Sequence, residues 1–131
     1  MHHSWREECG IFGIWNDLEA SKLAYLGLYA LQHRGQESAG IVACQDGKHS
    51  SHKGLGLVNE VFEPATLDAL VGAVAMGHVR YSTTGSNQIA NAQPLTAELL
   101  NGPVAIAHNG NLVNAAGIRR ALKEKGAIFQ G

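Results

Sequence analysis

The sequence predicts an α+β fold in which mainly antiparallel strands pack against helices. Two observations support this fold class: apolar runs of strand length outnumber helical segments, and two of these runs flank an Asp-Gly pair typical of a hairpin. With 131 residues, 45% of them apolar, the chain has the size and composition of one globular domain. No internal repeat or Pro-rich linker divides it.

The first predicted elements are a strand and a helix. Residues 9–15 form a short apolar run with β-branched and aromatic members, which indicates a buried strand opened by Cys9. From Leu18 to about Gln32, leucine and tyrosine side chains cover most of a helical circumference. We therefore expect this helix to be packed on more than one side.

A hairpin and a short helix follow. Residues 38–46 and 48–57 read as two strands joined at Asp46-Gly47, a pair that favours a tight turn. Residues 63–70 indicate a short helix, since Pro64 is tolerated in a first helical turn.

The remaining elements are two strands and a last helix. Strands are predicted at 73–81 and 104–108, with a loop rich in Gly, Ser, Thr and Asn over 82–93. A helix is expected over 115–125, capped by Asn114 and closed by Gly126. The last six residues begin a further apolar stretch and then stop, so we expect the fold to be incomplete at the C-terminus.

Composition and charge restrict the classes of function. The net charge of −1 gives no field of one sign, which argues against a nucleic acid or an anionic membrane as partner and favours a small molecule. Two cysteines without Cys-x-x-Cys spacing favour a reducing compartment, so we expect the cytoplasm. No run has the length of a secretory signal or a membrane span.

Four segments combine reactive or polar residues with glycine beside predicted strands. They are Cys9-Gly10, Gln32 to Gly40, Gly77 to Gly85, and His108-Asn109-Gly110-Asn111. Each has a simple structural explanation: Cys9 as a small buried side chain, Arg34 as a helix cap, Arg80 in a surface ion pair, Asn109-Gly110 as a turn. The chemical alternatives are a nucleophile, a carboxylate-binding guanidinium and a pair of oxyanion donors.

Other motifs give weaker indications of function. Cys44 lies in an apolar run and is interpreted as a packing residue. His49-Ser-Ser-His52 has no carboxylate or cysteine near it in sequence, so we interpret it as a solvated turn rather than a metal pair. Gly54-Leu55-Gly56 lacks the third glycine of a dinucleotide fingerprint, and no phosphate-binding Gly-Lys-Ser or Gly-Lys-Thr loop occurs.

Taken together, the four segments resemble the N-terminal glutaminase domain of the amidophosphoribosyltransferase family, from about Arg6 to Gln130. The matching stretches are Glu7-Glu8-Cys9-Gly10-Ile11-Phe12-Gly13, Leu31-Gln32-His33-Arg34-Gly35-Gln36-Glu37-Ser38-Ala39-Gly40-Ile41, Gly77-His78-Val79-Arg80-Tyr81-Ser82-Thr83 and Ala107-His108-Asn109-Gly110-Asn111-Leu112. Gln32 to Glu37 separates this family from glucosamine-6-phosphate synthase, which is more like Tyr-Arg-Gly-Tyr-Asp there.

The resemblance implies a fold and a set of site residues. The fold would be the four-layer αββα sandwich of N-terminal-nucleophile hydrolases. Residues 1–8 would be a propeptide and 9–131 the first part of the glutaminase domain. Cys9 would be the nucleophile, with Asn109 and Gly110 as oxyanion donors. Arg80 and Thr83 would bind glutamine, and Arg34 would support the loop that shapes the site.

The resemblance also implies partners. Glutamine would be hydrolysed to glutamate and ammonia, and a phosphoribosyltransferase domain, absent here, would transfer the ammonia to phosphoribosyl pyrophosphate in the first step of purine synthesis. The family uses Mg²⁺ and, in some members, a 4Fe-4S cluster, and we expect neither in this segment. We expect a homo-oligomer for the full-length protein and little activity for the fragment. The alternatives are a glutaminase serving another acceptor and a non-catalytic domain of the same fold.

Overall fold

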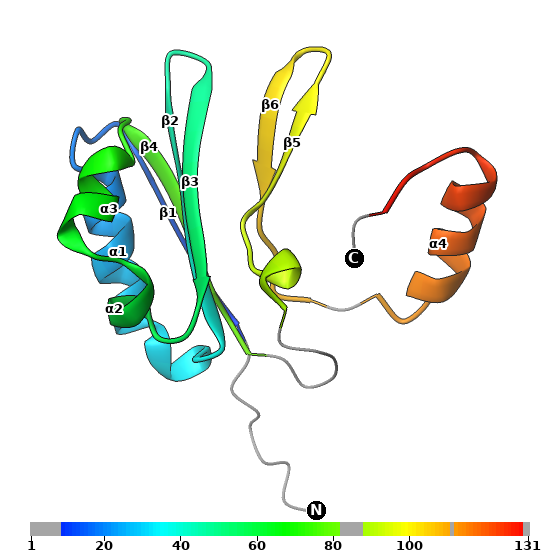
Figure 1. Ribbon diagram of the computed structural model, residues 1–131, viewed down its shortest axis with the longest axis horizontal. Helices are drawn as coiled ribbons and strands as arrows, with labels where there is room; N and C mark the ends of the chain where they lie inside the picture. The colour runs from blue at the N-terminus through cyan, green and yellow to red at the C-terminus, as the bar shows by residue number, and fades with distance from the viewer. Residues whose placement is uncertain (1–8, 82–87, 111, 130–131) are drawn as a thin grey trace, which may run out of the picture.

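The computed structural model describes residues 9–81, 88–110 and 112–129 (Figure 1). The predictions for residues 1–8 and for Thr83 fall outside this part of the chain. The elements in chain order are β1 (Gly10–Trp15), α1 (Ala20–Ala30), the 3-10 turn η1 (Gln32–Arg34), β2 (Ser38–Gln45), β3 (Lys48–Leu55), α2 (Val58–Val61), α3 (Pro64–Ala69), β4 (Val74–Arg80), the 3-10 turn η2 (Ile89–Asn91), β5 (Leu95–Leu99), β6 (Gly102–Ile106) and α4 (Ala115–Glu124).

The centre of the fold is an antiparallel sheet in the order β1-β4-β2-β3. Gly10 pairs with Val79 on β4, and Val79 pairs in turn with Ala39 on β2. The hairpin of β2 and β3 turns at Asp46 and Gly47, whose φ angles of 51° and 72° are those of the predicted tight turn. The predicted antiparallel sheet with helices against it is therefore confirmed.

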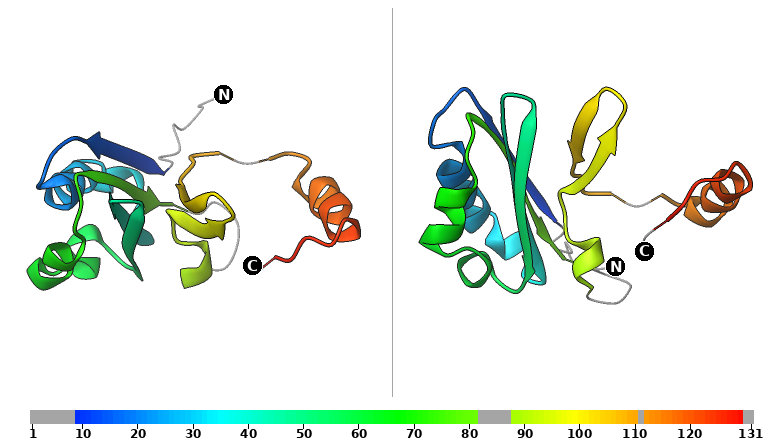
Figure 2. Two further views of the ribbon diagram at one scale, coloured as in Figure 1. Left: turned by 90° about the horizontal axis from the view of Figure 1, so that it is seen from above. Right: turned by 45° about the horizontal axis from the view of Figure 1, so that its top comes forward.

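The two faces of this sheet have different neighbours. On one face Ile41, Ala43 and Ala75 join Ala24 and Leu28 of α1 in the buried core, and α1, α2 and α3 cover this face (Figure 1). On the other face lies the hairpin of β5 and β6, with α4 beyond it, as the views in Figure 2 also show. Strand alternation places His78 and Gly40 on the side of the hairpin.

Glycine permits a close approach on this second face. A Cβ atom at Gly40 would collide with the backbone carbonyl oxygen of Gln93, because the chain around Gln93 crosses directly over β2. Ala92, Gln93 and Pro94 are buried at this crossing. The crossing holds the segment before β5 against the sheet.

Several predicted elements need correction. Strand β1 begins at Gly10, so Cys9 precedes the strand. Helix α1 ends at Ala30, and its outer side chains Leu26 and Tyr29 are 58% and 55% exposed, so within the described residues it is packed on one side only. The short helix α2 was not predicted.

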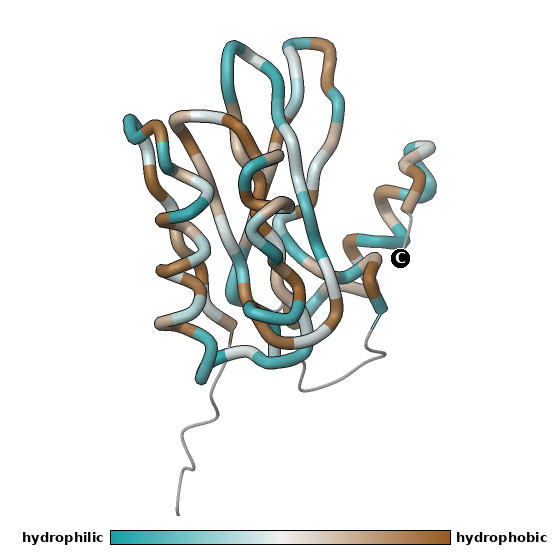
Figure 3. The backbone as a smooth tube through the Cα atoms, turned by 60° about the vertical axis from the view of Figure 1, so that its left-hand side comes forward, coloured by the Kyte–Doolittle hydropathy of each residue, from teal (hydrophilic) through white to brown (hydrophobic). Residues whose placement is uncertain are grey.

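The second half of the chain holds two more corrections. Strand β5 was not predicted, and β6 spans Gly102–Ile106 instead of 104–108. Helix α4 was predicted, and its amphipathic sequence is visible as alternating colours in Figure 3. Asn114 occupies its N-cap position without a side-chain hydrogen bond, and Gly126 follows its end with φ 90°.

The His49-Ser-Ser-His52 stretch lies inside β3 and is not a turn. The two histidines are three positions apart, so strand alternation sends their side chains to opposite faces. The His52 ring packs edge-on against Phe62, with 5.6 Å between centroids, and its Nε2 bonds the Val61 carbonyl at 3.0 Å. His52 is therefore a packing residue on the helical side of the sheet.

Candidate active site

The candidate site is centred on Cys9 at the open end of the sheet. Because Gly10 pairs with Val79, Cys9 lies beside the end of β4. The Tyr81 N–H donates to the Cys9 sulfur at 3.4 Å, and the thiol lies 3.5 Å from the Tyr81 carbonyl oxygen. The backbone after β4 therefore fixes the position of the sulfur.

Two distant side chains converge on the Cys9 carbonyl. Asn109, which is 100 positions further along the chain, donates from Nδ2 to the Cys9 oxygen at 2.9 Å. Arg34, at the end of η1, donates from Nε to the same oxygen at 3.2 Å. Arg34 thus holds the cysteine residue itself, a more direct contact than support of a loop.

Both predicted oxyanion donors of the Asn109-Gly110 loop already have a hydrogen-bond partner within the protein. The Asn109 amide is bonded to the Cys9 carbonyl, and the Gly110 N–H donates to Nδ1 of His108 at 3.3 Å. The Asn109 amide nitrogen carries a second N–H that the bond to the Cys9 carbonyl does not use, whereas the single N–H of Gly110 would have to leave His108 to bind an oxyanion. Both donors nevertheless lie in the loop that contacts Cys9.

Behind this loop lies a buried polar pair. Nε2 of His78 donates to the His108 carbonyl oxygen at 3.1 Å, and the His108 N–H donates to Oε1 of Gln93 at 2.7 Å. His78 is fully buried. Its burial lowers the pKa of the imidazole to about 4, so the ring is neutral at pH 7.

Arg80 is the last residue of β4, adjacent to Tyr81. Alternation along β4 puts Arg80 on the same face as His78, and the positive charge of Arg80 contributes to the low pKa of His78. The backbone of Arg80 is tied down: its carbonyl accepts the Glu37 N–H at 3.1 Å, and a Cβ atom at Gly35 would lie 2.7 Å from its carbonyl carbon. Carboxylate binding by Arg80 stays a prediction.

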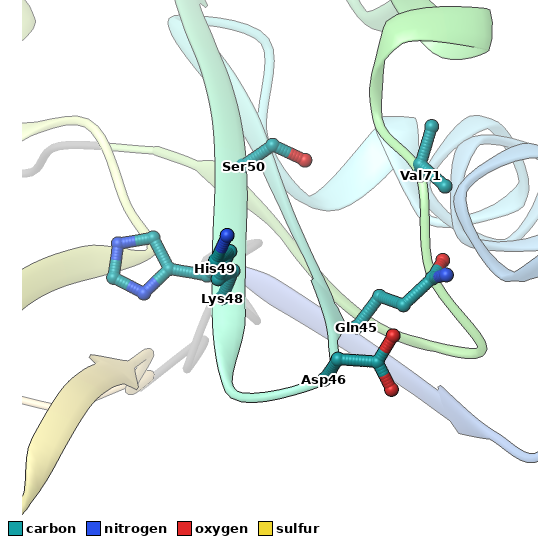
Figure 4. A pocket seen from close by; sticks show the side chains of 6 residues that line it. All are labelled: Gln45, Asp46, Lys48, His49, Ser50 and Val71. Carbon is teal, nitrogen blue, oxygen red and sulfur yellow. The ribbon is translucent and has the colours of Figure 1, made fainter.

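Other candidate sites are weak. Within residues 9–81, 88–110 and 112–129, no three His, Cys, Asp or Glu side chains gather in a way that could hold a metal ion. A shallow open pocket beside the turn of β2 and β3 contains none of the residues around Cys9, and Figure 4 shows His49 pointing away from Gln45 and Asp46 at its edge. None of the helices that the structure describes could span a membrane.

Sequence reasoning missed three contributors: Tyr81, His78 and Gln93. Tyr81 and His78 stand inside the segment that pointed to Arg80, but their roles depend on backbone contacts that spacing does not reveal. Gln93 was assigned to a loop. A buried glutamine directly before Pro94 gives no signal of its own in the sequence.

No protein-family model matches the chain. It is 55% identical over 125 residues to Amidophosphoribosyltransferase 2, chloroplastic, of Arabidopsis thaliana, and 52% identical over 125 residues to the amidophosphoribosyltransferase of Bacillus subtilis (strain 168). These matches cover 95% of this chain but only 22% and 26% of the relatives. A 50% identical amidophosphoribosyltransferase of Lacticaseibacillus casei is covered to 64%.

Two solved structures resemble the chain in fold and sequence. One is described as the allosteric regulatory enzyme of purine biosynthesis, with a TM-score of 0.87 and 50% identity. The other is a glutamine phosphoribosylpyrophosphate amidotransferase from B. subtilis complexed with ADP and GMP, with a TM-score of 0.82 and 51% identity. Each match covers 92% of this chain and 26% of the solved chain, so the chain spans about a quarter of their length.

Proposed function

We propose that the chain is the glutaminase segment of an amidophosphoribosyltransferase, the class of protein that it matches at 50–55% identity over 95% of its length. The observation that carries this proposal is the convergence on Cys9: Arg34 and Asn109, from segments far apart in sequence, both bond its carbonyl. A cysteine with only a packing role needs no such arrangement of donors.

The reaction begins at the sulfur of Cys9. The thiolate attacks the side-chain amide carbon of glutamine, and the carbonyl oxygen takes the electron pair in a tetrahedral intermediate. Collapse expels the protonated amine as ammonia and leaves a thioester on Cys9. Water then adds to the thioester, and glutamate and the free thiol are released.

Removal of residues 1–8 would supply the base. An α-amino group freed on Cys9 has a pKa of about 7.7 to 8.0, so near neutral pH it can accept the thiol proton and return it to the leaving ammonia. While the preceding residue is attached, this nitrogen is an amide and cannot take a proton. Residues 1–8 are therefore proposed to be a propeptide.

Oxyanion stabilisation falls to Asn109 and Gly110. The side-chain amide of Asn109 and the N–H of Gly110 lie in the loop next to Cys9. Asn109 can donate through the N–H that does not bond the Cys9 carbonyl, and rotation away from His108 would free the N–H of Gly110. Arg80 would bind the α-carboxylate of glutamine in a bidentate pair, with Thr83 in the same pocket.

The fold proposal is a four-layer αββα sandwich. It is supported by the sequence of layers in Figure 1, where α1, α2 and α3, the larger sheet, the hairpin of β5 and β6, and α4 follow one another. Exposed apolar side chains on both the hairpin and α4, among them Leu99, Ile106 and Leu122, fit a second half of the sandwich that further chain would complete.

The acceptor of the ammonia is proposed to be phosphoribosyl pyrophosphate, giving 5-phosphoribosylamine in the first step of purine synthesis. That part of the relatives extends beyond this chain. A 4Fe-4S cluster is typically held by four cysteine thiolates and this chain has two cysteines, so in a member that carries a cluster most of its ligands would come from other parts of the protein. A homo-oligomer and a cytoplasmic location complete the proposal; several plant relatives are named chloroplastic.

The test is a pair of activity assays on the full-length protein carrying Cys9→Ser. We expect glutamine-dependent synthesis of phosphoribosylamine to be abolished, because serine is a far weaker nucleophile, while ammonia-dependent synthesis is retained. Cys44→Ser is the matched control and should retain both activities. Cys44 lies near the end of β2, whereas the start of β2 pairs with the end of β4 that lies beside Cys9.

Equal loss of both activities in Cys9→Ser would contradict the role of Cys9. Glutamine hydrolysis without any use of phosphoribosyl pyrophosphate would point instead to a glutaminase serving another acceptor. A wild-type protein that hydrolyses no glutamine would leave only a non-catalytic domain of this fold.

A further inference from the structure

Two buried polar side chains behind the Cys9 site are not used by the proposed reaction. They are His78 on β4 and Gln93 in the segment before β5, which are 0% and 9% exposed. Burying polar groups is costly unless each is hydrogen-bonded, so their position requires an explanation.

Both side chains are bonded to one residue, His108. His78 donates from Nε2 to the His108 carbonyl at 3.1 Å, and the oxygen of Gln93 accepts the His108 N–H at 2.7 Å. The two bonds therefore hold the peptide groups on both sides of His108.

The orientation of the peptide groups around His108 restricts where the Asn109 side chain can point. The His108 carbonyl belongs to the same rigid plane as the Asn109 N–H, so its orientation limits the directions available to the Asn109 side chain. Gly110, the next residue, tolerates almost any φ and does not restrict its own conformation. The fixed plane before Asn109 supplies that restriction.

The protonation state of His78 suits the task. A donor at Nε2 needs the proton on that nitrogen, and burial keeps the ring neutral at pH 7. Arg80 on β4 and His108 on the loop are the charged or titratable neighbours that disfavour a second proton. Its strand partners, Ile11 on β1 and Gly40 on β2, carry no charge, and Lys53 on β3 lies beyond Gly40.

We propose that His78 and Gln93 are positioning residues that fix the peptide groups around His108 and so aim Asn109 and Gly110 at the developing oxyanion. This inference rests on the proposed glutaminase function. Both act by holding the peptide groups of His108 in the loop.

The experiment compares His78→Leu, which removes the donor, with His78→Gln, whose amide can donate from a similar distance. Three quantities are measured on the full-length protein: kcat for glutamine hydrolysis, KM for glutamine, and affinity for an aldehyde analogue of glutamine. The aldehyde adds the thiol and becomes tetrahedral, so its affinity depends on the oxyanion donors.

We expect His78→Leu to lower kcat and the aldehyde affinity together, by roughly 10- to 100-fold, while KM stays close to wild type. His78→Gln should recover most of the loss. His52→Leu is the matched control, because His52 also bonds a backbone carbonyl from Nε2, but on the helical side of the sheet. It should leave kcat and aldehyde affinity unchanged.

Gln93→Met provides a second test, since it removes the acceptor while keeping a side chain of similar size. If circular dichroism finds His78→Leu unfolded, Gln93→Met decides the question. Wild-type kcat and aldehyde affinity in the folded variants would overturn the inference, as would losses equal to those of His52→Leu. An inactive wild-type protein, or an unaffected Cys9→Ser, would overturn the proposed function and this inference with it.

Discussion

Replacing Gly40 with alanine tests the crossing that holds Gln93 against the sheet. The new Cβ atom would collide with the carbonyl oxygen of Gln93 and would lie 2.8 Å from Cγ of Lys53 and 3.0 Å from the Gln93 carbonyl carbon. A side chain such as Lys53 can turn aside, but the backbone of a buried segment cannot. Overpacking of this kind costs about 1–3 kcal/mol.

Gly13→Ala is the matched control, because Gly13 is also inside a strand and nothing lies within 4 Å of its added Cβ. Alanine there should stabilise the protein by about 0.5–1 kcal/mol, since glycine loses more backbone freedom on folding. The measurement is the free energy of unfolding from urea denaturation, with glutamine hydrolysis recorded in parallel. Gly40→Ala should be the less stable variant and should hydrolyse glutamine more slowly. If the Gly40→Ala protein were as stable and as active as Gly13→Ala, the close approach of the Gln93 backbone to Gly40 would be refuted.

Three further predictions concern the site. Asn109→Ala should lower kcat for glutamine hydrolysis by roughly 100- to 1,000-fold, the usual effect of losing one oxyanion donor, and an effect on KM alone would contradict this role. Arg34→Lys loses the Nε donor to the Cys9 carbonyl, so kcat/KM should fall by about 10-fold, as expected for one bond from a charged donor; unchanged kcat/KM would count against the contact. Burial in the folded protein lowers the pKa of His78 from 6.5 to about 4, so below pH 6.5 the unfolded chain binds a proton at this ring more readily than the folded protein does. The stability associated with the neutral ring is therefore fully present only above pH 6.5. As the pH falls from 6.5 to 4, wild type should lose up to about 3 kcal/mol more than His78→Gln in urea denaturation, and parallel curves for the two proteins would contradict the low pKa.

The local elements were predictable where a short stretch determines its own conformation. Asp46-Gly47 specifies a tight turn, and the turn fixes the pairing of β2 with β3. Pro64 begins α3 as expected, and Gly126 follows α4 in a left-handed conformation. In each case one or two residues with restricted or unusually free backbones carry the signal.

Elements without such a signal were missed. Leu95, Ala97 and Leu99 alternate with polar residues in β5, but the strand is only five residues long and every residue in it is exposed. Helix α2 has four residues, too few for a helical period to be visible. Exposure of the outer side of α1 could not be inferred either, because its leucines and tyrosines look the same whether or not they are covered.

The site lies between these two cases. The fold brings Cys9, Arg34 and Asn109 into contact, but the prediction that they belong together came from the resemblance and not from spacing. Their shared acceptor, the Cys9 carbonyl, could not be foreseen, since it depends on strand register. The support of the loop by His78 and Gln93 depends on how β4 and the segment before β5 pack together.

The most direct test of the central claim is the intact mass of the full-length protein before and after exposure to a glutamine analogue that alkylates the glutaminase nucleophile. We expect a mature protein without residues 1–8 that gains one adduct, located on Cys9 by peptide mapping, and no adduct in Cys9→Ser. A protein that keeps residues 1–8 and gains no adduct, or an adduct on Cys44 instead, would contradict the assignment of Cys9 as an N-terminal nucleophile.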